Sequence, residues 1–88
     1  MHWSILIWQN IVMVRFLENL IKPIVDKPDE VRITEIQGKS VCIYELHVAA
    51  GDFGKVIGKH GQNVKAIRTI LSAVSGKSGK RGVLEIIE

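Results

Sequence analysis

A short turn with two glycines, a lysine and a histidine carries the clearest chemical signal in this sequence. Its residues are Gly58, Lys59, His60 and Gly61. Glycine has no Cβ atom, so a partner molecule can approach the backbone closely at both ends of the turn. Residues 62–74 show helical periodicity, and the first N–H groups of a helix lack intrahelical partners and carry the positive end of its dipole. Free N–H donors, the helix dipole and the Lys59 ammonium together predict a site for phosphate groups.

Two apolar segments flank this turn and must position it. Residues 53–57 and 62–74 place apolar side chains at helical spacing, which predicts a short helix before the turn and a longer one after it. Asp52 is expected to cap the shorter helix. Upstream, residues 13–25 also show helical spacing, and Pro23 should kink that helix or close it near Lys22.

Three further segments favour β-strands. Residues 31–36 are rich in β-branched side chains, residues 41–49 alternate in polarity, and a glycine-containing hairpin connection, residues 37–40, lies between them. Residues 83–87 are expected to form a short terminal strand. The order α-β-β-α-α-β describes an α+β fold in one domain of 88 residues. The single cysteine, Cys42, falls in the second predicted strand, where a buried thiol is expected.

Positive charge is concentrated on the part of the chain that holds the turn. Residues 1–52 contain five Lys/Arg and seven Asp/Glu, whereas residues 53–84 contain seven Lys/Arg and no acid. The formal net charge of +3 therefore understates the local field that a polyanion would meet. A run of lysines is also compatible with a solvated surface, but such a long stretch without a carboxylate favours a binding patch.

Residues 1–12 differ from the rest of the chain. They are apolar, contain both tryptophans and carry no Lys, Arg, Asp or Glu. They lack the cationic start and cleavage site of a secretory signal, and they fall short of the roughly 20 apolar residues of a membrane span. Two interpretations stay open: translation begins at Met13 and residues 1–12 are an upstream extension, or they lengthen the first helix or form an apolar patch for self-association. We expect the domain to comprise residues 13–88, with no membrane span.

The turn and its surroundings resemble a KH domain of type II. The residues that carry the resemblance are Asp29-Glu30-Val31 before the first strand, Gly54-Lys55-Val56-Ile57-Gly58-Lys59-His60-Gly61 at the turn and Ala66-Ile67-Arg68-Thr69-Ile70-Leu71-Ser72-Ala73 after it. In this order of elements they are similar to the small bacterial single-KH RNA-binding proteins of the KhpA family, over residues 13–88. The departures from the family pattern are Pro23 and residues 1–12, which lie outside the binding surface.

The resemblance implies a type II KH fold, with a three-stranded mixed sheet and three helices packed on one face. It implies a cytoplasmic protein that binds single-stranded RNA and acts as an RNA chaperone or post-transcriptional regulator. It also implies a larger KH-containing partner, KhpB/Jag-like, and an effect on cell shape and peptidoglycan homeostasis.

A KH domain clamps the backbone of about four unpaired nucleotides along its glycine turn. The residues expected to bind RNA are Lys55, Ile57, Gly58, Lys59, His60, Gly61, Gln62, Val64, Lys65 and Arg68. The lysines at 55, 59 and 65 should face phosphates. Ile57 and Val64 should touch bases, on an aliphatic floor that lacks the aromatic platforms of many single-strand binders. Weak base preference is therefore expected for one copy, and a homodimer would raise the avidity.

Some side chains near the site leave two interpretations open. His60 either contacts phosphate or points into solvent. Arg68 either reaches a phosphate or a base, or is simply an exposed helix residue. The basic loop that contains Lys77, Lys80 and Arg81 is expected to add nonspecific phosphate contacts.

Two other classes of function compete with RNA binding. A KH-fold protein-interaction module with little RNA binding of its own stays open, although the intact cationic turn favours RNA. An enzyme finds little support, because His2, His47 and His60 are scattered along the chain and Cys42 stands alone. No catalytic residue, metal ligand or cofactor is therefore predicted.

Overall fold

The computed structural model describes residues 2–75 and 79–87, with side chains from residue 11 onward. Within these residues the chain forms three α-helices and three β-strands in the order α-β-β-α-α-β, with short 3₁₀ turns between some of them. The helices are α1 (His2–Ile21), α2 (Phe53–Ile57) and α3 (Gln62–Ser75), and the strands are β1 (Arg32–Gln37), β2 (Val41–His47) and β3 (Arg81–Ile87). The predicted order of elements is confirmed.

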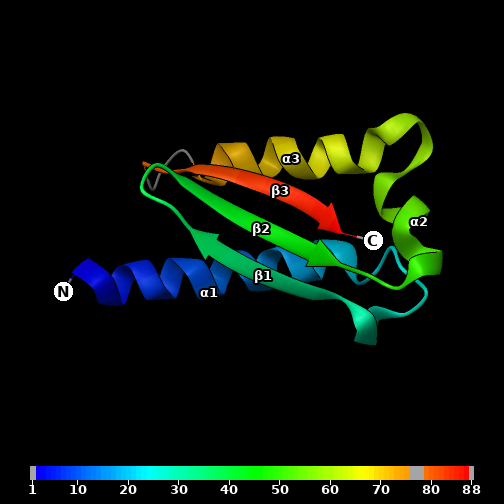
Figure 1. Ribbon diagram of the computed structural model, residues 1–88, viewed down its shortest axis with the longest axis horizontal. Helices are drawn as coiled ribbons and strands as arrows, with labels where there is room; N and C mark the ends of the chain where they lie inside the picture. The colour runs from blue at the N-terminus through cyan, green and yellow to red at the C-terminus, as the bar shows by residue number, and fades with distance from the viewer. Residues whose placement is uncertain (1, 76–78, 88) are drawn as a thin grey trace.

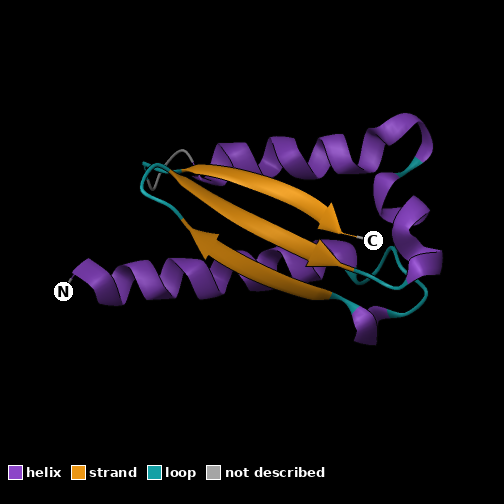
Figure 2. Cartoon of the chain, viewed as in Figure 1, coloured by secondary structure: helices purple, strands orange, loops and turns teal. Residues whose placement is uncertain are grey.

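The strands form one mixed sheet in the order β1-β2-β3. β1 pairs antiparallel with β2, and β2 pairs parallel with β3, so that Tyr44 lies beside Leu84. A parallel pair needs a long crossover connection, which α2 and α3 supply. The two long helices, α1 and α3, run along the sheet, and α2 lies at one end of the molecule, next to the start of α3 (Figure 1). Figure 2 shows the same arrangement by secondary structure. The predicted α+β fold, with three helices packed on one face, is confirmed.

One hydrophobic core lies between the covered face of the sheet and the helices. Side chains alternate along a strand, and in β2 Cys42, Tyr44 and Leu46 point into this core. The helices contribute Leu17, Ile21, Val56, Ile67 and Leu71. Cys42 is a free, buried cysteine as expected, and burial raises the pKa of its thiol.

The first helix is longer than its periodic segment. It begins at His2 and ends at Ile21, shortly before Pro23, because proline cannot continue the helical hydrogen bonding. The N-terminal half of α1 extends past the end of the sheet (Figure 1). Among the described side chains, burial begins at Met13, whereas Ile11 is 53% exposed. Residues 2–12 thus continue the helix, and where the domain begins stays a prediction.

Two strand boundaries differ from the sequence prediction. β3 begins at Arg81 rather than at residue 83, because the Arg81 N–H donates to the Ser40 carbonyl (3.0 Å) and the pairing starts there. β2 ends at His47 rather than at residue 49, since the chain then enters the 3₁₀ turn Ala50–Asp52.

None of the helices in the described ranges has the length and apolar character that crossing a membrane requires.

Candidate nucleic-acid interface

The glycine turn joins α2 to α3 at one end of the molecule (Figure 1). Gly58 follows α2 with φ of 78° and ψ of 170°, a backbone conformation that is essentially restricted to glycine. His60 (φ 58°, ψ 26°) and Gly61 (φ 71°) are also left-handed. Histidine is one of the few other residue types that adopt this region with some frequency. The shape of the turn itself therefore requires Gly58, independently of any ligand.

Asn63, which the sequence reasoning missed, holds the turn against α2. Its Nδ2 donates to the Lys55 carbonyl (2.9 Å). A Cβ atom added to Gly58 would lie 2.6 Å from Asn63 Cγ, so Asn63 can occupy this position only beside a glycine. The backbone adds bonds from Gly58 N–H to the Gly54 carbonyl (2.9 Å) and from Gly61 N–H to the Gly58 carbonyl (3.0 Å). Contacts within the protein thus fix the turn.

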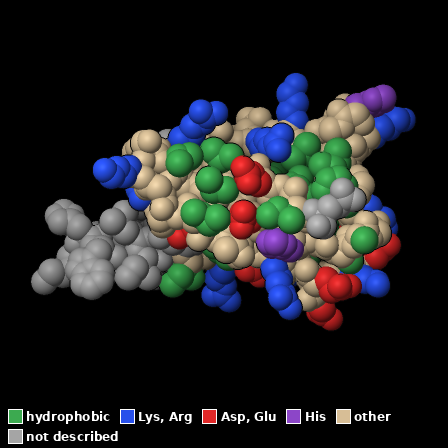
Figure 3. Space-filling view, in the orientation of Figure 1, with side chains coloured by type: hydrophobic (Ala, Val, Ile, Leu, Met, Phe, Trp, Pro, Cys, Tyr) green, Lys and Arg blue, Asp and Glu red, His purple; other side chains and the backbone are tan. Residues whose placement is uncertain are grey.

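The cationic side chains at the turn are open to solvent. Lys59, His60 and Lys65 are exposed, and none of them takes part in a salt bridge with another residue that the structure describes. Figure 3 shows His and Lys/Arg side chains projecting from the end of the molecule where Figure 1 places the turn. These groups are positioned to meet an anionic ligand.

An open groove of about 550 Å³ begins at the turn and follows α3. Its lining residues are Gly61, Val64, Lys65, Arg68, Thr69 and Ser72. Val64 is nearly buried and forms an apolar part of the floor. Arg68 Nη2 donates to the Leu84 carbonyl of β3 (3.4 Å), which ties the arginine to the sheet rather than leaving it free. The structure therefore brings together Gly61, Val64, Lys65 and Arg68 of the predicted site.

Other predicted residues do not line this groove. Ile57 is half-buried and packs against the hydrophobic core, whereas Gln62 is exposed at the first position of α3. Lys80 donates to Gln37 Oε1 (2.6 Å), and Arg81 begins β3. Both lie near the end of α3 that is opposite the turn, and the 14 residues of α3 span about 21 Å. Lys77, in the same basic loop, lies outside the described residues.

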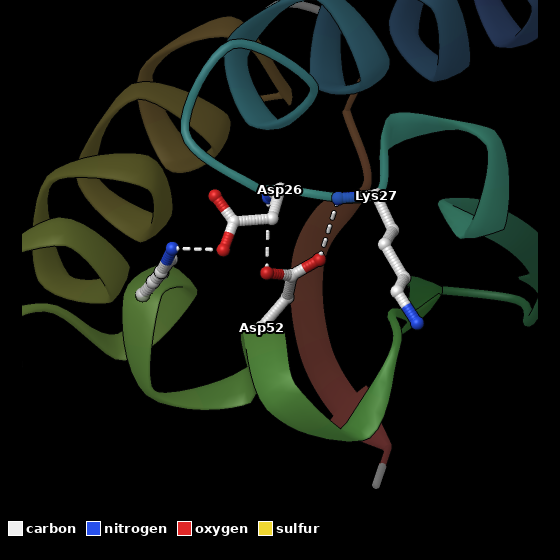
Figure 4. A network of polar contacts seen from close by, with 4 residues as sticks. Asp26, Lys27 and Asp52 are labelled. Atoms are coloured by element: carbon white, nitrogen blue, oxygen red, sulfur yellow. Dashed lines mark hydrogen bonds and ion pairs between the residues drawn. The ribbon is translucent and has the colours of Figure 1, made fainter.

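Asp52 is a buried carboxylate that joins two distant segments (Figure 4). It is 2% exposed, and its oxygens accept the backbone N–H groups of Asp26 (3.0 Å) and Lys27 (2.9 Å). Asp52 stands at the N-cap position of α2 as predicted, but its side chain makes no capping bond and reaches the α1–β1 connection instead. The N–H of Asp26, the N–H of Lys27 and the positive charges of Lys55 and Lys27 hold the pKa of Asp52 below its ordinary value.

Lys55 is engaged by the same connection. Its Nζ lies 2.5 Å from Asp26 Oδ2, and this hydrogen bond raises the pKa of Lys55. The contacts among Asp26, Lys27, Asp52 and Lys55 hold the start of α2 against the segment that follows α1. They therefore also position the chain that leads into the turn. Sequence reasoning placed Lys55 against phosphate and did not anticipate its carboxylate partner.

The chemistry that this arrangement offers is binding of an anionic chain. Within the described ranges, no three His, Cys, Asp or Glu side chains come together in a way that could hold a metal ion. The turn offers close backbone approach and exposed cations, and the groove beside it offers an aliphatic floor. Phosphates at the turn and bases along α3 would match these properties.

Comparisons with known proteins agree with this description. A family model described as the KH domain of KhpA/KhpB matches residues 14–86. The chain is 50% identical to RNA-binding protein KhpA of Chlamydia trachomatis over 76 residues, which cover 86% of this chain and 97% of the relative. It is 53% identical to the Chlamydia pneumoniae protein of the same name over 76 residues, with the same two shares. It is 51% identical to that of Clostridium acetobutylicum over 75 residues, 85% of this chain and 100% of the relative. No solved structure matches the chain.

Proposed function

Because this chain belongs to the KhpA/KhpB family of KH domains, we propose that it binds single-stranded RNA through the glycine turn and the groove beside it. The observation that carries this proposal is the geometry of the turn. No atom lies within 4 Å of a Cβ added at Gly61, Lys59 is exposed in the same turn, and the groove starts at Gly61. The names of the curated relatives, RNA-binding protein KhpA, support the same class of ligand.

In the proposed complex, the sugar–phosphate backbone lies across the turn and its bases lie along the groove. Lys59 neutralises a phosphate, and the positive end of the α3 dipole favours an anion at the same place. Lys65 faces the next phosphates, while Val64 provides an apolar surface under a base. Arg68 leaves the Leu84 carbonyl for a base edge or a phosphate at little cost, since that hydrogen bond is long at 3.4 Å.

We expect RNA binding to weaken steeply as salt is added. If about four to six phosphates are neutralised, the slope of log K against log salt is about −3 to −4, at about −0.7 per phosphate of a single strand. Fluorescence anisotropy with a labelled oligouridylate, at several salt concentrations between about 50 and 200 mM, measures this slope. The matched control is the same strand annealed to oligoadenylate, which should bind more weakly. Salt-independent binding, or a preference for the duplex, would contradict the proposal.

A finer part of the proposal concerns biological role. We propose a cytoplasmic RNA chaperone or post-transcriptional regulator that works with a larger KhpB/Jag-like protein and affects cell shape and peptidoglycan homeostasis. Membership of a family that groups KhpA with KhpB supports this, and Ile70 and Val74 support a protein partner because both are exposed apolar side chains on α3. A second copy of the chain would fit the same surface. RNA binding measured with and without the partner separates this role from a pure protein-interaction module.

We also propose that residues 13–88 form the domain. The family model begins at residue 14, and Met13 is the first buried residue among the side chains that the structure describes. A chain that starts at Met13 should therefore melt within about 4 °C of the full chain, a shift that corresponds to about 1 kcal/mol or less in a domain of this size. It should also bind the labelled oligouridylate with unchanged affinity. A larger loss of stability in circular dichroism melts would instead assign the N-terminal half of α1 to the domain.

A further inference from the structure

One cation of the proposed RNA site is already paired with a carboxylate. Among the described Lys and Arg residues of the acid-free segment 53–84, Lys55 alone takes part in a salt bridge, and its partner is Asp26. The two side chains are 44% and 74% exposed, so water screens the pair and leaves it weak enough to exchange. A phosphate group that arrives at the turn is a chemically equivalent acceptor for the same ammonium group.

The backbone holds this carboxylate in place. Asp52 is buried and accepts the N–H groups of Asp26 and Lys27, which fixes the main chain of residue 26 beside α2. The backbone of Lys55 is held as well, because its carbonyl accepts a hydrogen bond from the side chain of Asn63, which packs against Gly58. Lys55 is therefore anchored to the turn through its backbone and to Asp26 through its side chain. An exposed surface carboxylate without such an anchor would move away from the lysine much more readily.

We propose that Asp26 competes with RNA phosphate for the Lys55 ammonium and thereby limits the affinity of the glycine turn. This inference rests on the proposed function. When RNA binds, Lys55 exchanges one anionic partner for another, so its net contribution to affinity is small. The carboxylate that is left behind then repels the phosphate that replaced it, since the two anions lie within a Debye length of each other. Asp26 is thus an affinity-determining residue that opposes binding.

The test is the substitution Asp26→Asn in the full chain, read by anisotropy with the labelled oligouridylate. Asparagine has nearly the same shape as aspartate, and the backbone N–H of residue 26 still donates to Asp52. The fold and its melting temperature should therefore be unchanged in circular dichroism melts. We expect RNA to bind about two- to fivefold more tightly, the range that corresponds to one exposed ion pair. We also expect the salt slope to steepen by about 0.7, the value for one additional phosphate contact. Structural damage would weaken binding, so the sign of the change is itself diagnostic.

Asp29→Asn is the matched control. It removes the same charge from the same connection, and Asp29 is exposed and forms no salt bridge with any residue that the structure describes. Asp29→Asn should change the affinity for the labelled oligouridylate by well below twofold. If both variants tighten binding equally, net charge explains the gain and the role of Asp26 is overturned. Weaker binding by Asp26→Asn would overturn it as well.

The dependence on Lys55 completes the test. Lys55→Gln should weaken binding more in the Asp26→Asn background than in the wild type, because only there is the ammonium group free for phosphate. Equal losses in the two backgrounds would overturn the inference and leave the proposed function intact, provided that the wild-type chain binds RNA with the expected salt slope. Absence of RNA binding in the wild type and in every variant would overturn the proposed function itself.

Discussion

Replacing Gly61 by aspartate should strongly weaken RNA binding and leave the fold in place. No atom lies within 4 Å of a Cβ added at this position, so the new side chain would find open space beside the groove that Gly61 lines. The left-handed backbone, with φ of 71°, is one that Asp and Asn adopt more readily than most residues. The carboxylate would stand where phosphate must lie, and we expect affinity to fall by at least about tenfold, or 1.4 kcal/mol. Anisotropy with the labelled oligouridylate measures the loss, and circular dichroism checks the fold.

Gly61→Asn is the control that separates charge from shape. Asparagine has the same size and the same tolerance of left-handed backbone, but it is neutral, so it should weaken binding much less than aspartate does. Gly58→Asp would not allow this separation, because its Cβ would collide with Asn63 and its backbone combines φ of 78° with ψ of 170°, which is essentially restricted to glycine. Wild-type affinity in Gly61→Asp would mean that the RNA backbone does not pass the turn.

The elements that the sequence predicted well are those with strong local periodicity. Residues 62–74 were expected to be helical and α3 spans Gln62–Ser75, because Val64, Ile67 and Leu71 recur at the spacing of one buried helix face. The alternation in residues 41–49 predicted the strand β2 and the burial of Cys42 for the same reason. The glycine turn was recognisable because its backbone needs glycine wherever it occurs. Each of these signals is contained within one segment of the chain.

What the sequence could not show depends on contacts between distant segments. Asp52 precedes a helix, so the local rule favoured a cap, but its carboxylate meets N–H groups of residues 26 and 27 that only the fold brings close. The pairing of Lys55 with Asp26 is hidden for the same reason. The role of Asn63 had only a weak signal in the sequence. It is a polar residue at the second position of α3, and the missing Cβ of Gly58 leaves room for its side chain.

The grouping of positive charges also depends on the fold and could not be predicted from the sequence alone. Counted along the chain, the cations of residues 53–84 suggested one patch. In the structure they divide between the two ends of α3, with Lys59 and Lys65 near the turn and Lys80 and Arg81 near the opposite end. Charge density along a sequence therefore predicts that a polyanion is attracted, but not which cations act on it together.

Replacing Leu17 by alanine should destabilise the domain more than any other change considered above. Leu17 is 1% exposed and packs in the core between α1 and the sheet. Removing its branched side chain loses the transfer energy and leaves a cavity, which together cost about 2–5 kcal/mol. That is a large part of the total stability of a small domain, typically about 5–15 kcal/mol. Urea unfolding followed by circular dichroism, extrapolated to water, measures the change in the free energy of unfolding.

Ile11→Ala is the matched control on the same helix. Ile11 is exposed, so its truncation should change the free energy of unfolding by less than about 0.5 kcal/mol. A cost similar to that of Leu17→Ala would mean that something covers Ile11 in solution. If a second copy of the chain does so, the stability lost on truncation would grow with protein concentration, because association stabilises the folded state by mass action. The pair of substitutions therefore tests whether the N-terminal half of α1 contributes little to stability or forms a self-association surface, without removing any residue from the chain.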